Sequence, residues 1–171
     1  MHYYPSKIYI LRHAEKPEGA SERLSTKGYE RAAALAYYLP SIESEIHSIF
    51  AAGIGTHSPS HRPKETVKPL ARRLCKCIDD SFLKDRSSEL VAHILKEKKY
   101  EGRALVICWE HTFIDKIAKD FNACGIPSEK WPASRFDLVW KLTYMDQDPP
   151  YKLEQIPQCL MYNDSDTCIG G

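Results

Sequence analysis

Apolar residues along this chain fall into short runs of two kinds, one typical of strands and the other of helices. Mainly apolar or alternating runs predict β-strands at residues 7–12, 48–52, 75–78, 103–109, 136–144 and 151–155. Between them, apolar residues at intervals of three and four predict helices at residues 29–39, 63–74, 88–99 and 113–121. Ser25 or Thr26 can cap the first helix, and Pro40 is expected to end it.

Strands that alternate with helices indicate an α/β fold. We expect a three-layer α/β/α sandwich, in which helices cover both faces of a mostly parallel central sheet. Segment 103–109 is the most apolar strand and should lie near the centre of the sheet, where both strand faces are buried. The late strands 136–144 and 151–155 are joined by an Asp-Gln-Asp-Pro-Pro turn and should pair antiparallel at an edge.

Length and composition suit one folded domain. The chain has 171 residues, of which 43% are hydrophobic, and we place the domain at residues 1–162. Residues 163–171 are polar, end in glycine and are expected to form a mobile tail. The six cysteines include no C-x-x-C pair, so we expect free thiols, although Cys159 and Cys168 can pair under oxidation.

The charge balance argues against two classes of partner. A formal net charge of +1 gives no reason to expect attraction to nucleic acid or to an anionic membrane. No apolar run is long enough to span a bilayer, and the first residues lack the pattern of a signal peptide. We therefore expect a cytoplasmic protein in which any affinity for anions is local.

Arginine and histidine residues stand at the ends of three predicted strands. Arg12 and His13 end the first strand, Arg62 begins the helix that follows the second, and Glu110 and His111 follow segment 103–109. The carboxyl ends of parallel strands meet at one edge of a sheet, so these side chains should converge there. Arginine matches phosphate oxygens as a bidentate fork, and histidine can attack phosphorus. The pattern therefore predicts a site for a phosphate group.

The motifs around these residues resemble those of the histidine phosphatase superfamily, also called the phosphoglycerate-mutase-like superfamily. Its signature begins with Arg-His-Gly, and residues 12–14 read Arg-His-Ala. Residues 23–28 read Arg-Leu-Ser-Thr-Lys-Gly, residues 58–66 read Ser-Pro-Ser-His-Arg-Pro-Lys-Glu-Thr, and residues 104–111 form a strand that ends in the second histidine. Several motifs in the family's order are more specific than any one alone. The resemblance implies a phosphoglycerate-mutase-like fold.

The resemblance also implies phosphoryl transfer through a phosphohistidine. His13 would be the nucleophile, Arg12 and Arg62 would clamp the nonbridging oxygens, and His111 would stabilise the charge of the transferring group. The resemblance implies neither a cofactor nor a metal, since the arginines take the role that a magnesium ion plays elsewhere.

The proton donor for the leaving group is the least determined part of the predicted site. The family takes this acid either from the segment before the second histidine or from an Asp directly after it, and here Thr112 stands in that second position. Glu110 is the preferred candidate because it sits at a strand end beside His111. The other candidates are Glu15, Glu89 and Asp137.

The expected reaction is hydrolysis of a phosphomonoester. The substrate would be a small phosphorylated metabolite or a phosphorylated protein side chain. A phosphoglycerate-type mutase is the closest alternative, but the span from Arg62 to His111 is short for a capping insertion, which favours an open site and hydrolysis. A phosphate-binding or protein-interaction module that has lost catalysis is a further alternative, to which the missing Asp after His111 gives some support.

Overall fold

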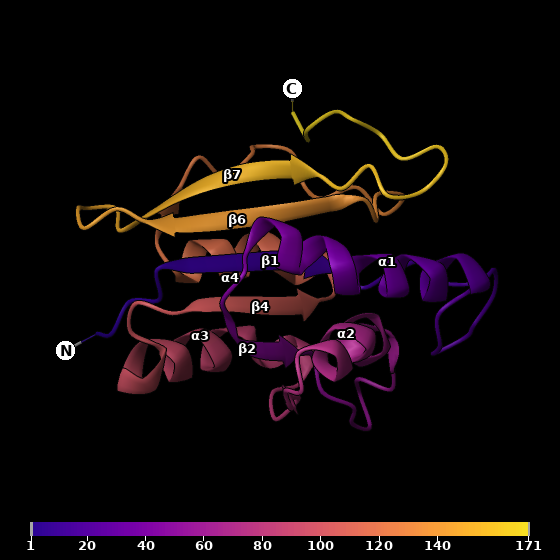
Figure 1. The fold of residues 1–171 in the computed structure, drawn as a ribbon, viewed down its shortest axis with the longest axis horizontal. Coiled ribbons are helices and arrows are strands. Elements are labelled where there is room, and N and C mark those ends of the chain that lie inside the picture. Colours follow the sequence, from indigo (N-terminus) through magenta and orange to yellow (C-terminus); the bar gives the residue numbers. More distant parts are fainter. Residues whose placement is uncertain (1, 171) are drawn as a thin grey trace.

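A single mixed sheet forms the centre of the computed structural model, which describes residues 2–170 (Figure 1). In chain order the strands are β1 (Lys7–Arg12), β2 (Ile46–Ala51), β3 (Ile78–Asp79), β4 (Ala104–Trp109), β5 (Ala123–Cys124), β6 (Leu138–Tyr144) and β7 (Tyr151–Pro157). Across the sheet their order is β3-β2-β4-β1-β6-β7-β5. The helices are α1 (Thr26–Ile42), α2 (Arg62–Arg73), α3 (Ser87–Lys96) and α4 (His111–Asp120), with short 3₁₀ turns η1 (Lys84–Arg86) and η2 (Lys98–Tyr100).

The strand directions differ from the prediction in one respect. β1 pairs parallel with β4, whereas β6 runs antiparallel to both β1 and β7. The antiparallel pairing of β6 with β7 was predicted and is confirmed, because the turn between them is too short for the crossover of a dozen or more residues that a parallel pair requires. The antiparallel pairing of β6 with β1 was not predicted. The predicted three-layer sandwich with a mostly parallel sheet is therefore confirmed only at the coarser level of a mixed α/β fold. β6 also lies inside the sheet, beside β1, rather than at the predicted edge.

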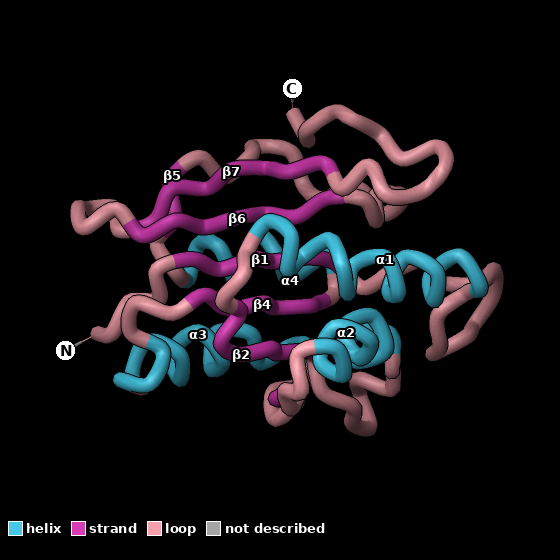
Figure 2. Tube along the Cα trace, viewed as in Figure 1, coloured by secondary structure: helices cyan, strands magenta, loops and turns pink. Residues whose placement is uncertain are grey.

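The strands β1 and β4 are buried on both faces. All six residues of β4 are buried, as expected of a central strand. In β1, Ile8 and Ile10 pack with residues of α3 and α4, while Tyr9 and Leu11 pack with residues of α1 and α2. This alternation follows from the pleat of the strand and matches the helices that Figure 2 shows on the two faces of the sheet.

Two element boundaries differ from the sequence prediction for identifiable reasons. The Ser25 side chain caps α1 by accepting a hydrogen bond from the Gly28 amide, but the helix continues through Pro40 to Ile42. Pro40 falls in the last turn, where its missing N–H costs one bond and does not stop the turn. Residues 75–77 are not a strand, because Cys75 adopts the left-handed conformation (φ +52°) and the chain closes the end of α2 there.

The C-terminal segment packs onto the body of the protein. Ile169 is 5% exposed and belongs to the core beside α3 and α4, and its amide and carbonyl both bond the Gln155 side chain at 2.9 Å. The mobility predicted for residues 163–171, of which Gly171 lies outside the described residues, stays a prediction. Cys159 and Cys168 are both free thiols in this structure.

Among residues 2–170, no helix combines the length and the hydropathy that crossing a membrane requires.

Candidate active site

The carboxyl ends of β1 and β4 lie side by side and bring the predicted residues together. Arg12 pairs with Trp109 in the ladder, and the His13 amide extends it by donating to the Trp109 carbonyl at 3.0 Å. Beyond these strand ends lies a cavity of about 120 Å³. Its wall includes five of the predicted residues, Arg12, His13, Arg62, Glu110 and His111.

His13 is held as a neutral imidazole with one ring nitrogen available. The side chain is 2% exposed, and Nδ1 lies 2.8 Å from the carbonyl oxygen of Ala14. Since a carbonyl only accepts, Nδ1 carries the proton and Nε2 keeps its lone pair. Burial, reinforced by the charges of Arg12 and Arg62, lowers the pKa of His13 to about 3 although the Ala14 carbonyl opposes the shift. The ring is thus in the nucleophilic form at neutral pH.

Arg12 is fixed by the loop that precedes β6. Its Nη1 donates to the carbonyl oxygens of Ala133 at 2.7 Å and Arg135 at 2.9 Å, and its guanidinium lies 3.8 Å above the ring centre of Phe136. Burial lowers the pKa of Arg12 to about 10, so the group stays cationic at neutral pH. These contacts therefore hold the buried, charged guanidinium of Arg12 in place at the cavity wall.

Arg62 is the first residue of α2, and Thr66 ties this end of the helix to β1. The Thr66 hydroxyl accepts from the Ala14 amide at 2.8 Å and donates to the Arg62 carbonyl at 2.7 Å. Arg62 Nη1 donates to the Ser21 carbonyl at 2.6 Å. Thr66, the last residue of the 58–66 motif, thus sets the distance between Arg62 and the His13 segment.

Glu110 and His111 stand at the start of α4. Glu110 Oε1 lies 3.2 Å from His111 Nδ1, and Oε2 accepts from the Thr112 hydroxyl at 2.7 Å. The nearby His111 ring, ahead of the Thr112 hydroxyl, lowers the pKa of Glu110 to about 2, while burial opposes the shift. Glu110 is therefore a carboxylate at neutral pH.

Three buried nitrogen atoms at this cavity have no hydrogen-bond partner among residues 2–170. They are Arg12 Nε, Arg62 Nε and His111 Nδ1. A buried donor without an acceptor costs about 1–3 kcal/mol, so an acceptor bound in the cavity would offset part of this cost. Lone-pair oxygens of an oxyanion satisfy donors of this kind, and the arginines supply the compensating charge.

Sequence reasoning did not assign four polar residues of the cavity wall to the site. They are Lys16, Ser58, Ser60 and Lys84. Lys16 lies just beyond the first motif, and both serines lie in or beside the Ser-Pro motif. Their positions in the sequence could therefore have placed these three residues at the site. Lys84 belongs to η1, which no sequence pattern predicted. With both lysines included, the cavity wall holds four basic side chains against the single carboxylate of Glu110, and the cavity favours an anion.

The three alternative proton donors do not line this cavity. Glu15 is turned away to the buried Arg31, 2.7 Å from its Nη2. Asp137 accepts from Arg135 Nε at 2.6 Å and from the Ser165 amide. Glu89 is exposed beside Arg86. Of the four predicted candidates, the structure brings only Glu110 to the cavity.

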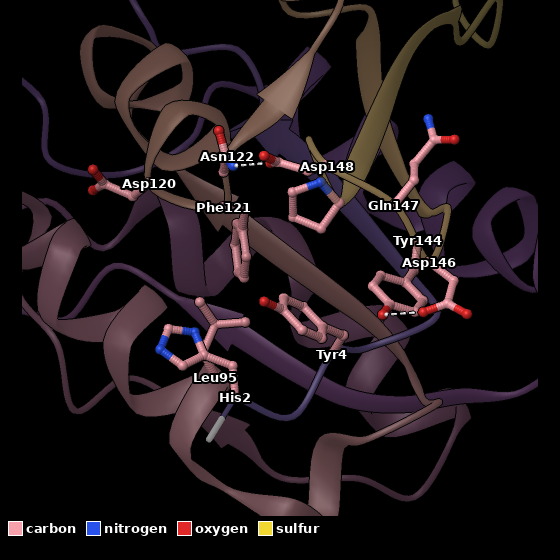
Figure 3. Close-up of a pocket in the computed structure, with 11 residues that line it drawn as sticks. His2, Tyr4, Leu95, Asp120, Phe121, Asn122, Tyr144, Asp146, Gln147 and Asp148 are labelled. Atoms are coloured by element: carbon pink, nitrogen blue, oxygen red, sulfur yellow. Dashed lines mark hydrogen bonds between the residues drawn. The ribbon is translucent and has the colours of Figure 1, made fainter.

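A larger hollow of about 500 Å³ lies at the opposite end of β1, between Tyr4 and the β6–β7 turn (Figure 3). Three aspartates, Asp120, Asp146 and Asp148, line it, and none of the candidate residues does. Carboxylates repel an anion. The cavity lined by Arg12 and His13 is therefore a better site for phosphate than this hollow, although its volume is smaller. In the described part of the chain, no group of three or more His, Cys, Asp or Glu side chains is placed to bind a metal ion.

Comparison with known proteins yields no family-model match and no match to a curated protein sequence, but it yields many similar solved structures. The protein histidine phosphatase SixA complexed with tungstate superposes with a TM-score of 0.60 at 16% identity, covering 90% of this chain and 97% of that one. The chain has the histidine phosphatase fold. A mycobacterial glucosyl-3-phosphoglycerate phosphatase with inorganic phosphate gives 0.59 at 15% identity, with coverage of 88% and 95%.

Phosphoglycerate mutase from Plasmodium falciparum is similar to the same degree. Its TM-score is 0.59 at 16% identity, with 95% of this chain and 98% of the mutase chain covered. Phosphatases and a mutase thus share the histidine phosphatase fold with this chain, and at these identities the likeness establishes the fold alone. The choice of reaction depends on the chemistry of the cavity.

Proposed function

We propose that this protein is a phosphomonoesterase that transfers the phosphoryl group of its substrate to His13 and then to water. The substrate is a small phosphorylated metabolite or a phosphorylated protein side chain. The observation that carries the proposal is the neutral His13 ring, with Nδ1 bonded to Ala14, beside a cavity lined by Arg12, Arg62 and His111, in which the buried Arg12 Nε and Arg62 Nε have no hydrogen-bond partner among residues 2–170.

In the first step the lone pair of His13 Nε2 attacks phosphorus. The N–P bond forms as the P–O ester bond breaks, and the leaving oxygen takes the electron pair and then a proton. Phosphoryl transfer depends mainly on in-line positioning and on charge stabilisation. Arg12, Arg62 and His111 supply both by donating to the nonbridging oxygens. Because these residues bring the compensating charge themselves, we propose that the reaction is independent of metal ions.

In the second step a water molecule attacks the phosphohistidine. The P–N bond breaks, its electron pair returns to Nε2, and the water proton goes to a base. Glu110 suits this role since its low pKa keeps it ionised in the free protein. A phosphate dianion bound beside Glu110 raises the pKa of the carboxyl by like-charge repulsion. The same repulsion lets Glu110 carry a proton to the leaving oxygen in the first step.

The secondary structure of the segment between Arg62 and His111 favours hydrolysis over a mutase reaction. This segment consists of α2, β3, η1, α3, η2 and β4 with their connections, all parts of the sheet or of the helices beside it. A mutase must retain the substrate and exclude water while the phosphoryl group is returned. No part of this segment forms a cap that would retain the substrate and exclude water.

Release of inorganic phosphate from p-nitrophenyl phosphate tests the proposal. We expect turnover by the intact protein in the presence of EDTA and none by His13→Ala, with both proteins showing the same circular dichroism spectrum. Incubation with phosphoglycerate should give free phosphate rather than the isomer. Isomer without phosphate would identify a mutase, and phosphate binding without any turnover would identify a module that has lost catalysis.

A further inference from the structure

A second, basic hollow borders the predicted phosphate site. It has a volume of about 660 Å³ and runs along the outer side of α2. We name it the α2 groove, and the residues that define it are Arg23, Ile54, Lys64, Lys68, Arg72 and Lys76.

The groove and the phosphate cavity meet at the start of α2. His61 lines the groove, and its neighbour Arg62 lines the cavity. The loop before α1 borders both, because the Ser21 carbonyl accepts from Arg62 while Arg23 binds Glu65. From Arg62 to Arg72 the helix advances about 15 Å. One extended ligand can therefore occupy the cavity and the groove together.

Cations form a row along the groove. Lys64, Lys68 and Arg72 follow at intervals of four residues, which places them on one face of α2, and Lys76 comes after the helix end. Lys64 is paired with Asp80 at 2.6 Å. For Lys68, Arg72 and Lys76 the structure of residues 2–170 contains no ion-pair partner. Since the whole chain has a net charge of only +1, this is a local concentration of unneutralised charge.

The groove also has an apolar part. Ile54 is 41% exposed, and Ala71 and Ile78 line the groove with it. No Phe, Tyr or Trp is among the described lining residues, which include only the smaller imidazole ring of His61. Nucleic-acid strands bind on basic grooves in which aromatic rings stack the bases, whereas polypeptides bring apolar and acidic side chains together. This composition favours a polypeptide over a nucleic acid.

We propose that the α2 groove docks an acidic segment of a phosphoprotein substrate whose phosphorylated side chain occupies the His13 cavity. Asp and Glu side chains of the segment pair with Lys68, Arg72 and Lys76, and its apolar side chains cover Ile54. This inference rests on the proposed phosphatase function and narrows its substrate to proteins with an acidic flank beside the phosphorylated residue.

Two synthetic phosphotyrosine peptides test the docking. One has a flank of Asp, Glu and Leu, and the other has a flank of Ser and Gly of the same length. We expect the kcat/KM of the intact protein to be about tenfold higher for the acidic peptide, mainly through KM. The Lys68→Glu/Arg72→Glu variant should lose this ratio. A matched control, Lys96→Glu/Lys98→Glu, reverses two charges at the end of α3 and should keep it.

Binding measured without catalysis separates failure of the docking from failure of the phosphatase function. A fluorescent, unphosphorylated copy of the acidic peptide should bind the intact protein and bind Lys68→Glu/Arg72→Glu about tenfold more weakly. If no phosphate ester is turned over but this difference holds, the phosphatase function fails and the docking stands. Equal kcat/KM values or equal binding for the two flanks overturn the docking. Tighter binding of single-stranded RNA than of the acidic peptide overturns it as well.

Discussion

Asp164 Oδ1 lies 2.6 Å from Arg31 Nη2, and the two side chains form an ion pair that is almost completely buried. The same guanidinium bonds Glu15, two residues after His13. Burial opposes ionisation of Asp164, yet the bonds from Arg31 and from the Met161 and Leu160 amides lower its pKa. The C-terminal segment is thus fastened, through α1, to the loop that leaves the candidate active site.

Asp164→Ala should destabilise the protein strongly. Arg31 would stay buried and charged but would lose one of its two carboxylate partners. Breaking a buried ion pair in this way costs about 3 kcal/mol. Urea unfolding measures the change. Asp166→Ala, an exposed change two residues further along the tail, should alter the unfolding free energy by less than about 0.5 kcal/mol. Equal effects of the two substitutions would show that the tail is not anchored through Asp164.

Arg62→Ala should lower kcat by about 100- to 1,000-fold, because it removes one preorganised donor to the transferring phosphoryl group. Arg62→Lys keeps the charge without the planar fork and should fall between Ala and the intact protein. Steady-state kinetics with p-nitrophenyl phosphate measure both. Arg86→Ala removes an exposed arginine that is absent from the cavity wall, and kcat should stay within about twofold. An Arg62→Ala enzyme with an unchanged kcat would remove Arg62 from the mechanism.

The dependence of kcat on the leaving group tests whether Glu110 donates the proton. An alkoxide needs a proton more than a p-nitrophenolate does, so Glu110→Gln should reduce kcat at least about tenfold more for an alkyl phosphate than for p-nitrophenyl phosphate. Glu89→Gln changes an exposed carboxylate away from the cavity and serves as the control. Equal losses on both substrates would assign the proton donor to another group.

The buried, neutral His13 makes stability depend on pH in a defined direction. Its pKa is about 3 in the folded protein and about 6.5 in the unfolded chain, so between these values the unfolded chain binds more protons. Stability from this group therefore falls as the pH falls below 6.5. Between about pH 7 and pH 5 the intact protein should lose about 2 kcal/mol more than His13→Asn, since the other titrating groups are common to both.

Chemical unfolding at the two pH values provides this comparison. A pH dependence that is identical in the intact protein and in His13→Asn would mean that His13 titrates normally when folded.

The sequence predicted the parts of the fold that depend on local pattern. An alternating apolar run placed β1, a continuous apolar run placed β4, and helical spacing placed α2 and α3 within a few residues of their observed bounds. It predicted that β6 pairs antiparallel with β7 but not that β6 pairs antiparallel with β1, because pairing with β1 depends on tertiary packing rather than on the pattern within 136–144. The start of β3 was also missed, since nothing marked Cys75 as a residue with positive φ, and the strand begins at Ile78 rather than at Cys75.

For the site, residue type and position at the end of a strand were sufficient to predict the residues that the motifs place directly at the cavity. Arg12, His13, Arg62, Glu110 and His111 do line one cavity. Other side chains could not be placed from the sequence. Glu15 follows the first motif directly, yet Arg31 holds its carboxylate away from the cavity. Such partners lie far apart along the chain, and only the folded structure shows which of them meet.

Trapping the phosphorylated protein during turnover tests the central proposal most directly. Protein quenched in alkali during hydrolysis of an isotopically labelled phosphate ester should carry one labelled phosphoryl group at His13, stable to alkali and lost in acid. The label should be absent from His13→Asn. A turning-over enzyme that never carries label, or that carries it on another residue, would contradict the account.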